Sequence, residues 1–178
     1  MQKIPGLTFV LGGARSGKSA YAEKLAVASG LPVTYIATAQ VYDTEFQQRI
    51  AHHQTRRPAD WALVEEPFLL AAALRQHAAP ERCLLVDCLT LWLAQWSCDD
   101  CNPPKDKTWA SERQELLDML PTLPGQIILV SNEVGLGIVP LGEINRKFQD
   151  EQGRLNQAVA AVCDKAVFMA AGLPLPLK

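Results

Sequence analysis

The sequence predicts an α/β fold with a doubly wound, mostly parallel sheet. Short apolar runs rich in β-branched residues alternate with longer segments that have a helical hydrophobic period. Strands joined by helices must run parallel, because a helical crossover returns the chain to the same end of the sheet. The 178 residues suffice for one domain and are few for two, so we expect a single domain over residues 1–178.

The apolar pattern places these elements in order. Five strands are expected at Leu7–Leu11, Val33–Ala37, Cys83–Asp87, Ile127–Ser131 and Ala166–Ala170. Helices are expected at Lys18–Ala28, Thr44–Arg56, Pro67–Ala78, Leu89–Trp96, Ser111–Leu120 and about Leu141–Val162. An irregular insert covers Ser97–Lys107, and the tail Gly172–Lys178, with two prolines, suits a short edge strand or an extended arm.

Composition excludes several classes of protein. Lys and Arg total 17 against 19 for Asp and Glu, a net charge of -2, which argues against general nucleic-acid binding. The apolar runs are too short to cross a bilayer, and the N-terminus lacks the pattern of a secretion signal. We therefore expect a cytoplasmic protein without membrane insertion, whose five cysteines are reduced thiols.

The strongest motif lies between the first expected strand and the first expected helix. It reads Gly12-Gly13-Ala14-Arg15-Ser16-Gly17-Lys18-Ser19 and has the spacing of a phosphate-binding loop. Its glycines let backbone amides converge on a β-phosphate, and the helix N-terminus adds partial positive charge. Lys18 is expected to bridge β- and γ-oxygens, and the Ser19 hydroxyl to bind Mg²⁺. A glycine-rich turn without a ligand is the alternative, but it would not need Lys and Ser after the last glycine.

Asp87 ends the third expected strand, where a phosphate-loop protein places the acid that holds Mg²⁺ through water. An isolated Asp at a strand end would more often cap the next helix, here the one beginning near Leu89. With the phosphate loop present, the metal role is favoured. A fold of the P-loop NTPase type follows from the two motifs together.

The phosphate loop alone does not identify the class of nucleotide protein. A guanine-nucleotide switch normally carries Asp-x-x-Gly after its third strand and Asn-Lys-x-Asp after a later one. This chain instead has Asp87-Cys88-Leu89-Thr90 and Asn132-Glu133-Val134-Gly135. The switch interpretation therefore lacks both its sensor and its base-reading motif.

Further motifs appear in a characteristic order after the phosphate loop. They are Tyr35-Ile36-Ala37-Thr38-Ala39, Arg49-Ile50 with His53 and Arg57-Pro58, Trp61 with Glu65, Asn132-Glu133-Val134-Gly135 with Gly137-Ile138-Val139-Pro140, and Gly153-Arg154-Leu155-Asn156-Gln157. With these motifs, nearly the whole chain resembles the bifunctional adenosylcobinamide kinase and adenosylcobinamide-phosphate guanylyltransferase of the cobalamin pathway. The resemblance implies phosphorylation of the corrinoid adenosylcobinamide with ATP or GTP, then transfer of GMP from GTP through a guanylylated histidine, with Mg²⁺. It also implies a homotrimer.

The resemblance also implies which residues form the site. The catalytic residues would be His53 and Lys18. The nucleotide would be bound by the loop from Gly12 to Ser19 and by Ala37, Thr38, Ala39, Gln54, Thr55, Arg56, Arg57, Glu65 and Asp87. The family usually has Lys or Arg directly after the nucleophilic histidine, whereas this chain has Gln54, with Arg56 or Arg57 as a possible substitute.

The chain has three histidines, and only one fits the role of nucleophile. From the residues alone, His52 and His53 suggest a polar helix end that faces solvent. Neighbours on a helix point about 100° apart, so only one can face a given site, and the spacing of the family motif selects His53. His77, late in an Ala- and Leu-rich helix, is assigned no role.

Two other functions stay open: a small-molecule kinase without guanylyl transfer, and a regulatory nucleotide-binding protein. A covalent GMP adduct would separate the bifunctional enzyme from both.

Cys98 and Cys101 have the spacing of half a zinc site, but no second pair or nearby histidine completes it. We interpret them as two incidental thiols in a solvated loop.

Overall fold

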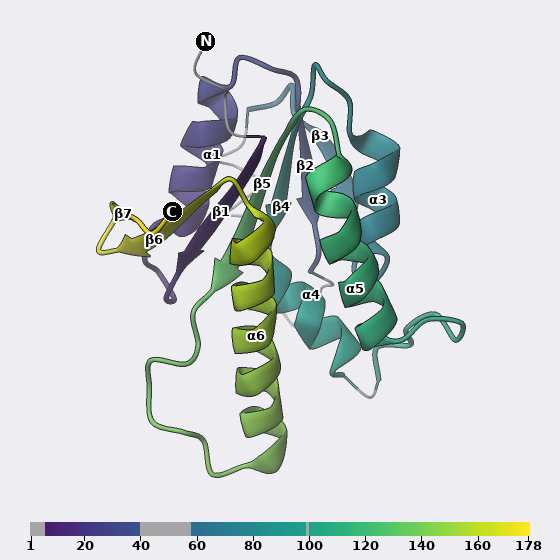
Figure 1. The fold of residues 1–178 in the computed structure, drawn as a ribbon, viewed down its shortest axis with the longest axis vertical. Coiled ribbons are helices and arrows are strands. Elements are labelled where there is room, and N and C mark those ends of the chain that lie inside the picture. Colours follow the sequence, from purple (N-terminus) through teal and green to yellow (C-terminus); the bar gives the residue numbers. More distant parts are fainter. Residues whose placement is uncertain (1–5, 40–57, 99) are drawn as a thin grey trace.

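A single seven-stranded sheet runs through the described part of the chain (Figure 1). The structure, a computed structural model, describes residues 6–39, 58–98 and 100–178. The strands are β1 Leu7–Gly12, β2 Val33–Ala37, β3 Ala62–Glu65, β4 Cys83–Asp87, β5 Gln126–Asn132, β6 Lys165–Ala170 and β7 Leu173–Pro176. Their order is β3-β2-β4-β5-β1-β6-β7, and all pairs are parallel except β6 with β7. This arrangement confirms the predicted mostly parallel sheet.

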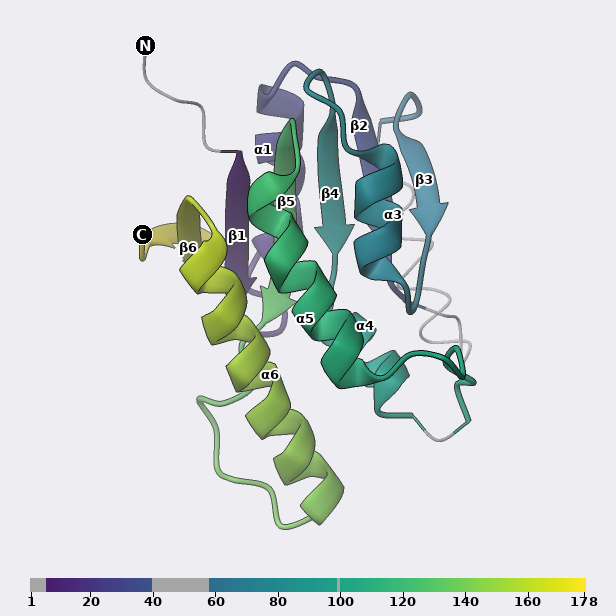
Figure 2. The same ribbon diagram turned by 45° about the vertical axis from the view of Figure 1, so that its right-hand side comes forward.

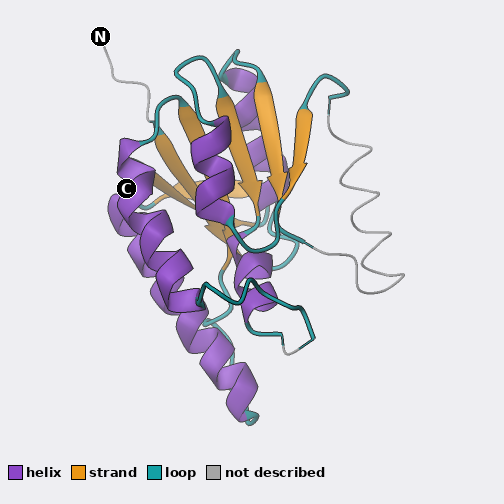
Figure 3. Ribbon diagram, turned by 90° about the vertical axis from the view of Figure 1, so that its right-hand side faces the viewer, coloured by secondary structure: helices purple, strands orange, loops and turns teal. Residues whose placement is uncertain are grey.

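Helices cover both faces of the sheet, as a doubly wound fold requires. Helix α1, Lys18–Ala28, lies on one face, while α3 (Leu70–His77), α5 (Trp109–Met119) and α6 (Glu143–Val162) lie on the other (Figures 2 and 3). Helix α4, Leu89–Trp96, follows the carboxyl end of β4. None of the described helices is long and apolar enough to cross a membrane. The expected helix Thr44–Arg56 lies outside the described residues.

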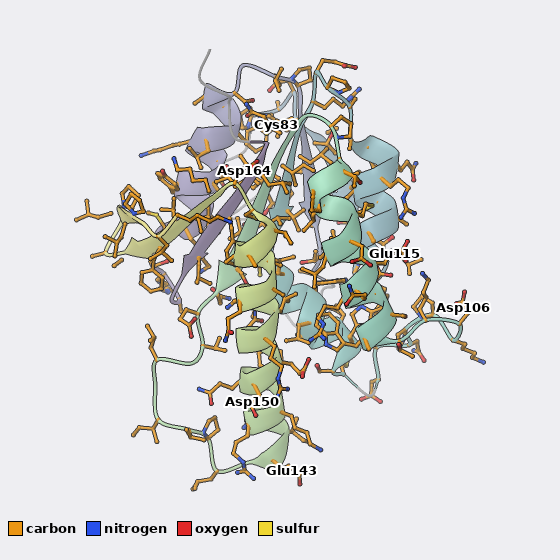
Figure 4. All side chains as sticks on the ribbon, in the orientation of Figure 1. Cys83, Asp106, Glu115, Glu143, Asp150 and Asp164 are labelled. Carbon is orange, nitrogen blue, oxygen red and sulfur yellow. A yellow bond between two sulfur atoms is a disulfide. The ribbon has the colours of Figure 1, made fainter. Side chains whose placement is uncertain are left out.

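Alternation along the strands builds a core on each face. Phe9 of β1 packs with the helices α3, α5 and α6, and its neighbour Val10 packs with Ala22 and other residues of the α1 face. Trp92 of α4 is fully buried and donates its indole N–H to the Phe68 carbonyl oxygen at 2.8 Å. Asp164, beyond the end of α6 in Figure 4, accepts a hydrogen bond from the Leu7 N–H at 2.9 Å and so joins α6 to the start of β1.

Several elements differ from the sequence-based expectation. Strand β3 was not expected, since its four residues are mostly exposed and lie at the sheet edge. Strand β7 decides the open choice for the tail in favour of an antiparallel edge strand. Helix α3 begins at Leu70 instead of Pro67, because the Glu66 carboxylate accepts the N–H groups of the two preceding residues. Helix α6 begins at Glu143, two residues later than expected.

The cysteines divide into two groups. The interpretation of Cys98 and Cys101 as two thiols is wrong, since the structure joins them in a disulfide with a Cα–Cα distance of 5.4 Å. Their close spacing brings the two sulfur atoms together at the end of α4. Cys83, Cys88 and Cys163 are free, as expected, and all three are buried. Burial raises the pKa of Cys83 to about 11 and the pKa of Cys88 and Cys163 to about 12, so all three stay protonated and act in packing.

A buried carboxyl group joins two helices on the α3 face. Glu112, on the first turn of α5, is only 1% exposed and accepts the backbone N–H of Ala71 at 3.0 Å. Ala71 lies in the first turn of α3, where backbone N–H groups have no partner within the helix. Burial raises the pKa of Glu112, and the hydrogen bond from Ala71 opposes this shift only partly. The site therefore needs an acceptor oxygen but disfavours a negative charge.

We expect Glu112→Gln to be as stable as the parent protein or more stable at pH 7, because the amide oxygen accepts the same hydrogen bond without a charge. In the parent, the pKa of Glu112 is higher in the folded than in the unfolded chain. Its contribution to stability is thus greatest below the ordinary pKa of about 4.3 and decreases as pH rises through the folded value. Urea denaturation between pH 4 and 7 measures the unfolding free energy of both proteins. The part of its decrease with rising pH that comes from Glu112 should be absent in Glu112→Gln.

Glu112→Ala is the matched control. It leaves the buried Ala71 N–H without a partner and should be less stable than Glu112→Gln by about 1–3 kcal/mol of unfolding free energy at every pH, because neither variant titrates at this position. A Gln variant as unstable as the Ala variant would contradict this account of the site.

Candidate nucleotide-binding site

The phosphate loop joins the end of β1 to the start of α1, and its glycines are required by close contacts. A Cβ atom at Gly12 would lie 2.6 Å from the Ser16 hydroxyl oxygen and 2.8 Å from the Met169 carbonyl oxygen. Gly17 has a φ of +92°, in the left-handed region that favours glycine. A Cβ there would also lie 3.1 Å from the Cα of Gly172, whose N–H donates to the Ser16 carbonyl oxygen at 2.9 Å. The loop is therefore packed against the turn between β6 and β7.

Lys18, the first residue of α1, lies over this loop. Its Nζ donates to the Gly13 carbonyl oxygen at 3.1 Å. Burial lowers the pKa of the Lys18 ammonium, and the nearby Asp87 carboxylate opposes this shift. Cys88 is also close, but its own raised pKa keeps the thiol neutral at pH 7. Lys18, at the start of α1, and Asp87, at the end of β4, thus lie near enough to interact.

Asp87 is held by contacts from the neighbouring strand β2. The Tyr35 hydroxyl lies 3.1 Å from the Asp87 Oδ2 and donates to it. Just beyond β2, the fully buried Thr38 hydroxyl donates to the Cys88 carbonyl oxygen at 2.7 Å and accepts the Cys88 N–H at 3.0 Å. Thr38 therefore fixes the backbone that follows Asp87, and the predicted contact of Thr38 with the nucleotide stays a prediction.

The strand register directs the key groups toward one helix. Asp87 pairs with Val130, and Val130 packs with Ala22 in the core between the sheet and α1. Because paired residues of parallel strands share a face, the Asp87 side chain points to the α1 side, where Lys18 and Ser19 begin the helix. The arrangement therefore puts a cation and a carboxylate together at the carboxyl end of the sheet, with Ser19 next to Lys18 in the chain. This is the usual ligand-binding edge of such folds.

The other predicted residues lie at different distances from the loop. Ala37 ends β2, and Ala39 follows it closely. Glu65 pairs with Ala37 but belongs to the edge strand β3. Four strand steps separate β3 from β1, which corresponds to about 19 Å at the usual strand spacing. Glu65 thus lies far from the phosphate loop along the sheet, and its predicted contact with the nucleotide stays a prediction.

The predicted histidine segment lies outside the described residues. This applies to His53, Gln54, Thr55, Arg56 and Arg57.

Within the phosphate loop, Ala14 and Arg15 are exposed, and Arg15 has a positive φ of 55°. The contact of Tyr35 with Asp87 was not predicted, although a tyrosine in a buried strand is a signal that its hydroxyl has a specific partner.

The oxygen donors of the site suit a hard divalent cation. Within residues 6–39, 58–98 and 100–178, no cluster of three or more His, Cys, Asp or Glu side chains could hold a metal. A site of the phosphate-loop type does not need one, because phosphate oxygens and water complete the ligands of Mg²⁺. Ser19 and Asp87 are the predicted sources of the hydroxyl and the carboxylate that such a site takes from the protein, and their metal role stays a prediction.

The contact between Thr38 and Cys88 yields a stability test. We expect Thr38→Val to lower the unfolding free energy by about 1–3 kcal/mol, because it leaves a buried carbonyl and a buried N–H without their partner. Thr38→Ser keeps the hydroxyl and should cost less. Urea denaturation of both variants measures the difference, and a Val variant as stable as the Ser variant would rule out this role.

Comparison with known proteins identifies the family to which this phosphate loop belongs. The family described as cobinamide kinase / cobinamide phosphate guanyltransferase matches residues 8–177. The chain is 58% identical to the bifunctional adenosylcobalamin biosynthesis protein CobP of Pseudomonas aeruginosa, covering 95% of each chain. It is 35% identical to the bifunctional adenosylcobalamin biosynthesis protein CobU of Salmonella typhimurium, covering 97% of this chain and 99% of the relative. The chain therefore belongs to the cobinamide kinase / cobinamide phosphate guanyltransferase family.

Proposed function

We propose that this protein phosphorylates adenosylcobinamide with ATP or GTP and then transfers GMP from GTP to the new phosphate, giving adenosylcobinamide-GDP. The observation that carries the proposal is the phosphate loop with Lys18 close to Asp87, in a chain that matches the family from residue 8 to residue 177. The names of the relatives, bifunctional proteins of adenosylcobalamin biosynthesis, support both activities.

The first reaction would take place at the phosphate loop. Its backbone N–H groups and the N-terminus of α1 favour the negative β-phosphate, and Lys18 reaches the β- and γ-oxygens. The hydroxyl oxygen of the aminopropanol arm bonds to the γ-phosphorus, and its proton passes to water. The bond from the γ-phosphorus to the bridging oxygen breaks, and the nucleoside diphosphate leaves. Ser19 and Asp87 would hold Mg²⁺ here, and the ion would supply positive charge near the phosphate oxygens. Tyr35 and Thr38 keep Asp87 in position for this.

The second reaction needs a nucleophile, for which we propose His53. A neutral imidazole can attack the α-phosphorus of GTP without a separate base, because its ordinary pKa of about 6.5 leaves it mostly unprotonated at pH 7. Pyrophosphate leaves, and the corrinoid phosphate then displaces the histidine. Arg56 or Arg57 would hold the α-phosphate oxygens. The homotrimer, the cytoplasmic location and the absence of a nucleic-acid partner stay predictions.

The metal role of Asp87 can be separated from a structural one. We expect Asp87→Asn to lower kinase activity by about a hundredfold or more and to raise the Mg²⁺ concentration needed, because the amide lacks the charge that favours the cation. The unfolding midpoint should change little, since an amide oxygen can still accept the Tyr35 hydroxyl. Turnover is measured against Mg²⁺ concentration, and Tyr35→Phe, which keeps the carboxylate, is the control. Unchanged Mg²⁺ dependence in Asp87→Asn would discard the metal role.

The guanylyl transfer can be tested through its covalent intermediate. With GTP labelled at the α-phosphate, the protein should retain label in an acid-labile, alkali-stable bond, as expected of a phosphoramidate. His53→Ala should remove the label and the GMP transfer but spare the kinase step, whereas His52→Ala should keep the label. Loss of label in His52→Ala alone would move the assignment to His52. If neither change mattered, the kinase without guanylyl transfer would be the better function.

A further inference from the structure

Asn132 occupies a position between the two parts of the candidate site. It is the last residue of β5, the strand that lies between β1, which leads into the phosphate loop, and β4, which ends at Asp87. Asn132 pairs in register with Gly12, and the N–H of the next residue, Glu133, donates to the Gly12 carbonyl oxygen at 3.0 Å. The carboxyl end of β5 is therefore directly beside the phosphate loop.

The side chain of Asn132 points to the same side of the sheet as Asp87. Residues two apart in a strand share a face, so Asn132 lies on the face of Val130. Val130 pairs with Asp87, and it packs toward α1. The side chains of Asn132 and Asp87 thus face the end of α1 that carries Lys18. Figure 1 shows β5 between β1 and β4, with the carboxyl ends of the three strands at one edge.

Buried polar side chains hold the backbone of Asn132 from the opposite face. Its N–H donates to the Thr90 hydroxyl oxygen at 2.8 Å, and its carbonyl oxygen accepts from the Asn156 Nδ2 at 3.0 Å. Ser131 and Gln152, both fully buried, extend the network, since the Ser131 hydroxyl lies 2.7 Å from the Asn156 Oδ1 and 2.9 Å from the Gln152 Nε2. Two helices, α4 and α6, thereby fix the end of β5.

The carboxamide of Asn132, in contrast, makes no hydrogen bond to any part of the chain that the structure describes. Its Oδ1 is buried and has no partner. A buried polar atom without a partner is costly, and native proteins retain such atoms mainly where function requires them. The backbone is held firmly on one face while the side chain is left free on the other, which is the arrangement expected of a group that binds a substrate.

We propose that Asn132 contacts the reacting groups of the kinase step. One end of its carboxamide accepts a hydrogen bond from the hydroxyl of the acceptor, and the other end donates to an oxygen of the γ-phosphoryl group. In this step the hydroxyl oxygen bonds to the γ-phosphorus, the bond from the γ-phosphorus to the bridging oxygen breaks, and the hydroxyl proton passes to water. The amide stays neutral and takes no proton, so its effect is to orient the two reactants. This inference rests on the proposed function.

The position of Asn132 predicts an effect on one reaction only. The γ-phosphoryl group is the group transferred in the kinase step, whereas GMP transfer occurs at the α-phosphorus, nearer the nucleoside. A residue beside Gly12 that faces Lys18 should therefore matter for phosphorylation of adenosylcobinamide and much less for guanylylation of the protein. A merely structural role would affect both reactions together with stability.

The test uses Asn132→Ala, with Asn145→Ala as the matched control, since Asn145 is exposed on α6. For each variant, kcat and KM of ATP-dependent phosphorylation of adenosylcobinamide are measured, with the yield of label from α-phosphate-labelled GTP and the unfolding midpoint in urea. We expect Asn132→Ala to lower kcat by about a hundredfold, as loss of one preorganised hydrogen-bonding group in a site typically does. The label should be unchanged, because GMP transfer occurs at the α-phosphorus. The midpoint should be unchanged, because the carboxamide has no partner to lose among the described residues.

A second variant, Asn132→Asp, keeps the shape but adds a negative charge beside the γ-phosphate. It should lower kcat at least as strongly as Asn132→Ala. Parent-like kcat in Asn132→Ala would overturn the inference while leaving the proposed function intact, and so would a loss of label and stability that parallels the loss of kcat. A parent protein that does not phosphorylate adenosylcobinamide at all would instead defeat the proposed function.

Discussion

The parallel register of three central strands, β1, β5 and β4, determines where the groups of the candidate site lie. Gly12, Asn132 and Asp87 end these strands, and the side chains of Asn132 and Asp87 share the face covered by α1. A shift of one residue in any strand would turn its last side chain to the opposite face. The buried apolar residues on both faces of the sheet prevent such a shift. The packing of the core therefore stabilises the fold and also determines where the side chains of the site lie.

Polar groups near this edge are fixed from behind by other polar groups. Thr38 holds the backbone of Cys88, and Thr90 with Asn156 holds the backbone of Asn132. Each of these hydroxyl or amide groups is buried or nearly so, where an unpaired partner would be costly. At this edge of the sheet, β5 is followed by the Gly-rich segment 133–142 and then by the first half of α6, where Figure 4 labels Glu143 and Asp150.

Local pattern predicted most of the fold and only part of the site. Strands Val33–Ala37 and Cys83–Asp87 match the structure to the residue, because each is an apolar run between turn residues. Strand β3 was missed, since its short, exposed sequence forms a strand only by pairing with β2. The phosphate loop is continuous in sequence and was predictable. The bonds from Tyr35 to Asp87 and from Thr38 to Cys88 join residues about fifty positions apart, which no local pattern reveals.

The contact between the phosphate loop and Gly172 links the site to the order in which the chain is made. The loop begins at Gly12, but the Ser16 carbonyl oxygen accepts its hydrogen bond from Gly172, in the turn between β6 and β7. The intervening stretch of about 160 residues takes roughly 8–32 s to synthesise at the usual rate of translation. Until then the loop lacks the turn that supports it, so the nascent chain on the ribosome cannot yet hold a nucleotide in the way the finished protein does.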